Sequence, residues 1–147
     1  YVANNDAGTG IIVDAISHSK YWDSTAIFII EDDPQGYGGD HVHPNRSIGL
    51  VVSPWAKREF TSSVHYSIPS MYRTIEMLLG LPPMNLNDAM APPMYDVWVS
   101  TPDNTPYNAI ASNIPMETNT ARSFGADMSE KMDFSKADNA PGLGYVL

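Results

Sequence analysis

With 147 residues, the chain is long enough for one domain with a real core, and a composition of 43% apolar and 17% charged residues is typical of globular proteins. The formal net charge of −9 argues against nucleic acid or an anionic membrane as a partner, and it is compatible with cation binding. The chain has no cysteine, which excludes disulfides and thiol chemistry, and no apolar run reaches the length of a membrane span.

Two elements are predicted before the first loop. Asn5 and Asp6 form a predicted N-cap of a helix whose apolar face extends to about Ser17. Residues 25–30 then predict a strand, because five apolar residues in a row suit a strand buried on both faces of an α/β sheet.

Two further elements follow a long loop. Residues 48–53 predict a second short buried strand, which Pro54 ends. Residues 68–79 predict a helix because their apolar side chains recur at helical spacing, and Gly80 closes it. Two strands are too few for a covered parallel sheet, so the chain is expected to be part of a larger domain that begins upstream of Tyr1.

The second half is rich in proline and asparagine. Residues 81–147 predict an extended arm with at most one short helix, near residues 118–132. We expect residues 1–80 to form the C-terminal α/β part of one domain and residues 81–147 to pack on that same domain. The predicted fold class is α/β, with a proline-rich extended C-terminal arm.

The loop of residues 31–47 is the strongest candidate for a functional site. Three carboxylates directly follow the first strand, which is where open α/β sheets bind ligands. Adjacent carboxylates repel each other and are costly to desolvate, so a cation is their natural partner. The alternative for Asp32 and Asp33 is a solvated loop, and the alternative for His41 is a hydrogen bond to loop backbone.

Motifs along nearly the whole chain resemble those of bacterial phosphoesterases, the enzymes grouped with phospholipase C and acid phosphatases in the alkaline phosphatase superfamily. Some members of this family carry an N-terminal β-propeller. The motifs stand in collinear order, which makes the resemblance more specific than a single motif. They are Ser17-His-Ser-Lys-Tyr-Trp22, Thr25-Ala-Ile-Phe-Ile-Ile-Glu-Asp-Asp-Pro-Gln35, Gly39-Asp-His-Val42, Arg46-Ser47, Val52-Ser-Pro-Trp-Ala-Lys-Arg58, Ser70-Met-Tyr-Arg-Thr-Ile-Glu76, Leu79-Gly-Leu-Pro-Pro-Met84, Pro93-Met94, Thr105-Pro-Tyr107 and Met132-Asp-Phe-Ser135.

The resemblance implies an alkaline-phosphatase-like α/β sandwich and a metal-dependent phosphoester hydrolase. By position, Asp32 and Asp33 are similar to the pair that ligates the metal, and His41 is similar to an active-site residue that binds metal or phosphate. His18 is similar to an active-site histidine of the acid-phosphatase members. The family's Ser or Thr nucleophile has no counterpart here, so it is expected upstream, and this segment alone is expected to be inactive.

The chain departs from the family pattern at two positions: His43 replaces an acid and Asn45 replaces a histidine. These changes bear on which divalent metal is bound. Carboxylate with imidazole suits zinc, manganese or iron, and carboxylate alone suits magnesium or calcium, so the metal stays open.

The first hypothesis is therefore the C-terminal segment of a secreted or periplasmic, metal-dependent phosphoesterase that acts on a phosphoester substrate. Its partner would be the N-terminal remainder of the same protein. The alternative is a non-catalytic structural or binding module that keeps the phosphoesterase fold within an assembly with other chains. The sequence leaves open whether the substrate is a phosphomonoester, a phosphodiester or a phospholipid.

Overall fold

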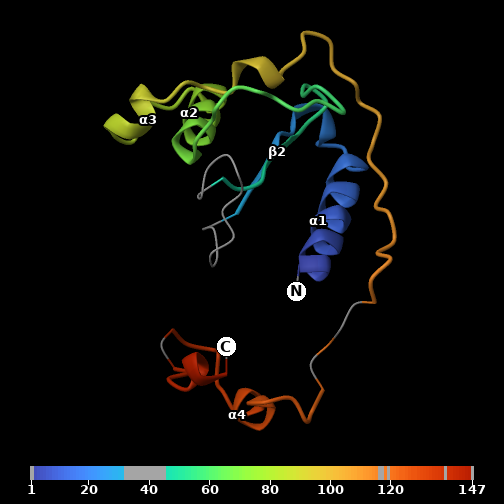
Figure 1. Ribbon diagram of the computed structural model, residues 1–147, viewed down its shortest axis with the longest axis vertical. Coiled ribbons are helices and arrows are strands. Elements are labelled where there is room, and N and C mark those ends of the chain that lie inside the picture. The colour runs from blue at the N-terminus through green and yellow to red at the C-terminus, as the bar shows by residue number, and fades with distance from the viewer. Residues whose placement is uncertain (1, 32–45, 116–117, 119, 138, 147) are drawn as a thin grey trace. The chain divides into compact units, whose positions relative to one another are not determined.

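The computed structural model describes residues 2–31, 46–115, 118, 120–137 and 139–146 (Figure 1). Its contacts divide the chain into two compact units. One unit is Thr9–Ala109, and the other combines Tyr1–Gly8 with Ile110–Leu147. The candidate residues that the structure describes belong to the Thr9–Ala109 unit.

A two-stranded antiparallel sheet lies at the centre of this unit. Strand β1 (Ile27–Ile30) pairs with β2 (Gly49–Val52), so that Ile27 lies opposite Val52 and Ile30 lies opposite Gly49. Both strands were predicted within two residues of these bounds. The prediction that they are buried on both faces is wrong, because β1 is only partly buried and the first half of β2 is exposed. Within the described residues, each strand pairs with the other along one edge, and no further strand pairs with its outer edge.

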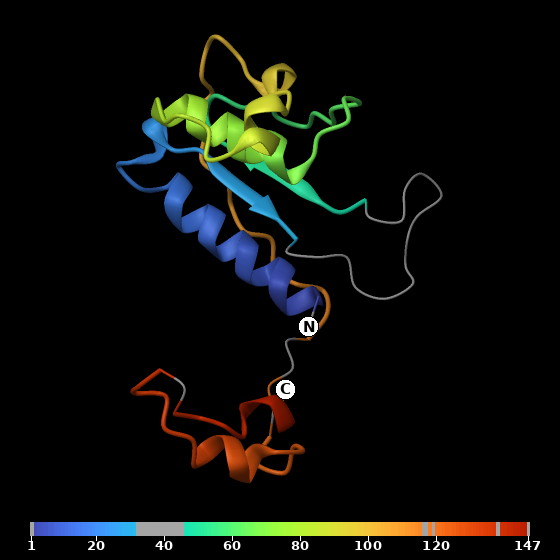
Figure 2. The same cartoon turned by 90° about the vertical axis from the view of Figure 1, so that its left-hand side faces the viewer.

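Helices cover the two faces of this sheet. Figures 1 and 2 show the sheet between α2 (Ile68–Leu79) and the part of α1 (Val2–Ser17) that belongs to the same unit. Phe28 and Val51 lie opposite each other on the face toward α2, where they pack against the buried core of Met71, Met94 and Val97. The alternation of side chains along the strands therefore places the core between the sheet and α2.

The prediction for α2 is confirmed at both ends. Its first turn is closed by Ser70 Oγ, which accepts the Ser67 backbone N–H at 3.2 Å. Gly80 ends the helix with φ of 67°, in the left-handed region that glycine adopts at little cost. For α1 the predicted start is wrong, because the helix already includes Val2 and continues through Asn5 and Asp6.

The proline-rich half contains more regular structure than was predicted. Besides α4 (Ala126–Glu130), which falls in the predicted region, it contains α3 (Leu86–Met90). Asn85 caps α3 by accepting the Asn87 N–H at 2.8 Å, and Asp88 accepts the Asn85 N–H at 2.9 Å. The expectation of at most one short helix is therefore wrong, because reciprocal capping stabilises a single helical turn between two proline pairs. Short 3₁₀ turns occupy Trp22–Ser24, Tyr95–Val97 and Leu143–Tyr145.

The described elements mix helices with a small sheet, which agrees with the general α/β class. In the part of the chain that the structure describes, none of the helices is both long enough and apolar enough to span a membrane.

Candidate functional site

The carboxyl end of β1 leads directly into the acid-rich connection. Glu31 is the last described residue before this connection, and its carboxylate accepts a hydrogen bond from Ser47 Oγ. Ser47 lies two residues before β2, so this contact joins the two ends of the connection. The carboxylate closest to the strand thus bonds locally across the start and the end of this connection.

The predicted metal ligands Asp32, Asp33 and His41 lie outside the described residues. Across the ranges that are described, no group of three or more His, Asp or Glu side chains is placed to hold a metal ion. The assignment of Asp32, Asp33 and His41 therefore stays a prediction, as does the choice of metal.

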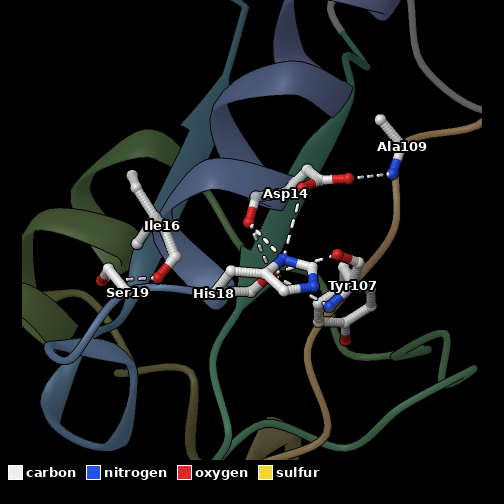
Figure 3. A network of polar contacts seen from close by, with 7 residues as sticks. Asp14, Ile16, His18, Ser19, Tyr107 and Ala109 are labelled. Carbon is white, nitrogen blue, oxygen red and sulfur yellow. Dashed lines mark hydrogen bonds and ion pairs between the residues drawn. The ribbon is translucent and has the colours of Figure 1, made fainter.

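His18 is described, and it lies just past the C-terminal end of α1 (Figure 3). Its Nδ1 is 2.9 Å from the backbone oxygen of Asp14 and 3.2 Å from Oδ1 of the same residue. Both oxygens are acceptors, so Nδ1 carries the proton and donates it to Asp14. The side chains of His18 and Asp14 are 45% and 36% exposed, which leaves the histidine ring accessible to solvent.

Asp14 is itself held by a distant segment of the chain. Its Oδ2 accepts the backbone N–H of Ala109 at 2.6 Å. The buried hydroxyl of Ser17 reinforces the same contact: it accepts the N–H of Tyr107 at 3.0 Å and lies 3.2 Å from the Tyr107 backbone oxygen. Figure 3 shows these bonds joining the last turn of α1 to residues 107–109.

The Tyr107 ring packs between two side chains. Trp22 meets it edge-on at 6.0 Å between centroids, and the Arg58 guanidinium lies 4.2 Å from its centre. Arg58 Nε also pairs with Asp103 Oδ2 at 3.0 Å. Hydrogen bonds from the Thr105 side chain and backbone, together with the nearby Arg58 charge, hold the pKa of Asp103 below its usual value.

His18 and the acid-rich connection lie toward opposite ends of β1. Ser53 Oγ donates to the Thr25 backbone oxygen at 2.8 Å, which joins the end of β2 to the amino end of β1, where Trp22 and Tyr107 also lie. Glu31 follows the carboxyl end. At about 3.3 Å per residue, the strand puts roughly 10 Å between its first and last residues. The described residues therefore bring His18 next to Asp14, in the turn whose Ser17 bonds Tyr107, and they do not bring it next to Glu31.

Sequence reasoning missed the partner of His18. Asp14 stands four residues before His18, and residues at this spacing lie on one face of a helix, so the signal was present. The contacts of Asp14 with Ala109 and of Ser17 with Tyr107 span 95 and 90 residues, and no local sequence pattern predicts them.

Comparison with known proteins gives no match to this chain among family models, curated proteins or solved structures.

Proposed function

We propose that this chain is the C-terminal segment of a metal-dependent phosphoric-ester hydrolase with an alkaline-phosphatase-like α/β sandwich fold. Asp32 and Asp33 bind a divalent metal ion, and His41 binds the metal or the phosphate. The nucleophile comes from the N-terminal remainder of the same protein. The collinear motifs along the chain support this proposal.

One observation carries the proposal: the candidate ligands belong to a single connection whose two ends meet. Ile30 and Gly49 are paired across the sheet, which puts their Cα atoms about 5 Å apart. Just beyond the sheet, the Glu31–Ser47 hydrogen bond also holds the two ends of the connection together. Asp32 and His41 therefore belong to one closed segment, which lowers the entropic cost of gathering them around an ion.

The chemistry fits these residue types. A divalent cation on carboxylate and imidazole ligands polarises a phosphoryl oxygen and activates an oxygen nucleophile. Negative charge develops on the phosphoryl oxygens in the transition state, and the cation offsets it. A role for His18 at the same phosphate requires one more feature. To act on the same phosphate, His18 needs the connection after Glu31 to extend back along β1, over roughly the 10 Å length of the strand.

The experiment is a calorimetric titration of the chain with zinc and with manganese, followed by the same titration of Asp32→Asn and Asp33→Asn. We expect one strong site in the parent chain and a loss of at least about tenfold in affinity in each variant. Asp23→Asn is the matched control, because Asp23 is exposed and its one described contact, with Trp55 Nε1 at 2.9 Å, uses the backbone oxygen.

Hydrolysis is measured on a longer form of the protein that includes the upstream residues. The substrates are p-nitrophenyl phosphate, bis(p-nitrophenyl) phosphate and a phospholipid, which separate the three substrate classes. We expect metal-dependent turnover that Asp32→Asn reduces roughly a hundredfold or more. Metal binding without turnover of any of the three would overturn the hydrolase and favour the non-catalytic module. Absence of metal binding in both forms would reject the site itself.

A further inference from the structure

The hydrogen bonds of His18 determine which of its two ring nitrogens carries the proton. Nδ1 faces two acceptors, the backbone oxygen and the Oδ1 of Asp14, at 2.9 and 3.2 Å. Neither acceptor has a proton to give, so the neutral ring holds its proton on Nδ1. In the described part of the chain, Nε2 has no hydrogen-bond partner, and its lone pair is available to a ligand.

Asp14 is fixed on its other side as well. Because Oδ2 accepts the Ala109 N–H at 2.6 Å, the carboxylate is held in place by a backbone group outside the helix, and Oδ1 is left for His18. Ser17 anchors the neighbouring residue Tyr107 to the same turn. A carboxylate held in this way orients a histidine ring more firmly than a freely rotating surface carboxylate does.

We infer that Asp14 is the positioning residue of His18: it holds the imidazole as the Nδ1–H tautomer and presents Nε2 as the one basic nitrogen. Nε2 can then bind a metal ion or take a proton, and once protonated it can donate to a phosphoryl oxygen. A carboxylate in this position acts as the Asp of an Asp–His pair does in acid–base catalysis, through the orientation and tautomer of the ring. A role of Nε2 in phosphoester chemistry rests on the proposed function. The assignment of the Nδ1–H tautomer rests only on the contacts of His18 with Asp14.

Another reading of the same contacts is purely structural, with Asp14 holding residues 107–109 against α1 and meeting His18 only as a neighbour on the helix. The two readings differ for Asp14→Asn. Ala109 N–H and His18 Nδ1–H meet different oxygens of Asp14, and an asparagine keeps an oxygen at only one of these two positions. A positioning role therefore changes the tautomer, and a structural role changes only the stability.

The test is long-range proton–nitrogen NMR of the ¹⁵N-labelled chain at alkaline pH, where histidine rings are neutral. The His18 signals are assigned by their loss in His18→Gln. We expect the Nδ1–H tautomer to dominate in the parent chain and its ratio to the Nε2–H tautomer to fall about fivefold in Asp14→Asn. Asp6→Asn, an exposed carboxylate of the same helix, is the matched control and should leave the ratio unchanged.

Ser17→Ala provides the second comparison, because it removes the anchor of Tyr107 and one donor to the Asp14 backbone oxygen, at 3.0 Å, but leaves the Asp14 carboxylate in place. We expect it to leave the His18 tautomer ratio in place. A dominant Nε2–H form in the parent chain would overturn the inference, and so would an equal shift in Ser17→Ala and Asp14→Asn. Neither result depends on hydrolysis, so a failure here is distinct from a failure of the proposed hydrolase.

Discussion

The two ends of β1 differ in how the chain holds them. At the amino end, polar bonds join α1, the strand and residues 103–109, and they involve Ser17, Ser53 and Tyr107. At the carboxyl end, the described contact between the two sides of the acid-rich connection is the exposed pair of Glu31 and Ser47. The amino end is therefore a scaffold of buried hydroxyls and backbone groups, whereas the carboxyl end leads into the connection that contains the candidate ligands.

This difference explains why the two candidate histidines are best treated separately. His18 belongs to the scaffold end, where its orientation follows from described contacts with Asp14. His41 belongs to the connection at the other end, outside the described residues. Variants at the amino end should therefore act on stability and on the His18 ring, and variants at the carboxyl end should act on ligand binding.

The largest effect is expected for Trp22→Ala at the amino end. Trp22 is 4% exposed and packs on Tyr107, so its removal leaves a cavity under the anchored segment. We expect the free energy of unfolding to fall by about 3–5 kcal/mol, measured by urea denaturation with circular dichroism. Ile48→Ala is the counterpart near the carboxyl end. Ile48 is 69% exposed, and its loss should change stability by about 0.5 kcal/mol or less.

Trp22→Phe tests whether packing explains that effect. Trp22 Nε1 is buried and has no hydrogen-bond partner among the described residues, so the phenyl ring loses no bond that the structure shows. We expect a cost below about 1.5 kcal/mol. A cost as large as that of Trp22→Ala would mean that the indole N–H has a partner and that the account of this end is incomplete.

The sequence predicted the elements that a local pattern defines. The helix at residues 68–79 was predicted at its true bounds, because its apolar spacing, Gly80 and the following prolines all agree. The short helix α3 was missed, although Asn85 and Asp88 stand at capping-box spacing. The start of α1 was placed too late, since Asn5 and Asp6 are good caps that here lie inside the helix.

The candidate site was predicted from its chemistry and not from its geometry. The position of the acidic run after a strand followed from the apolar run before it, and β1 does end directly before Glu31. The surroundings of His18 could not be predicted in full, because they depend on Tyr107 and Ala109, some ninety residues away. Such contacts follow from tertiary packing, which a one-dimensional pattern does not encode.

A smaller effect is expected from acid at the amino end. The pKa of Asp103 is lowered by its bonds to Thr105 and by Arg58, so its folded-state pKa lies below the unfolded value of about 3.8. A group with a lowered pKa contributes stability above the unfolded pKa and loses it as the pH falls through the folded pKa. Asp103→Asn should therefore reduce stability at pH 7, and its difference from the parent chain should shrink steadily below about pH 4.

The comparison for this acid effect is Asp127→Asn, since Asp127 is an exposed carboxylate in α4. Urea denaturation at a series of pH values from about 2.5 to 7 measures both variants against the parent chain. An Asp103→Asn difference that stays constant over this range would show that Asp103 acts through shape or through the neutral hydrogen bonds of residues 103–105, and not through its charge.

The smallest effect on stability is expected at the carboxyl end, for Glu31→Gln. The Glu31 side chain is exposed, and its amide replacement can still accept a hydrogen bond from Ser47 Oγ. We expect the free energy of unfolding to change by less than about 0.5 kcal/mol, and zinc or manganese affinity to change far less than in Asp32→Asn. A loss of metal affinity as large as that in Asp32→Asn would make Glu31 a ligand and move the site onto the end of β1 itself. A large loss of stability would instead contradict the division between the two ends, because it would show that the carboxyl end also depends on its polar contacts for folding.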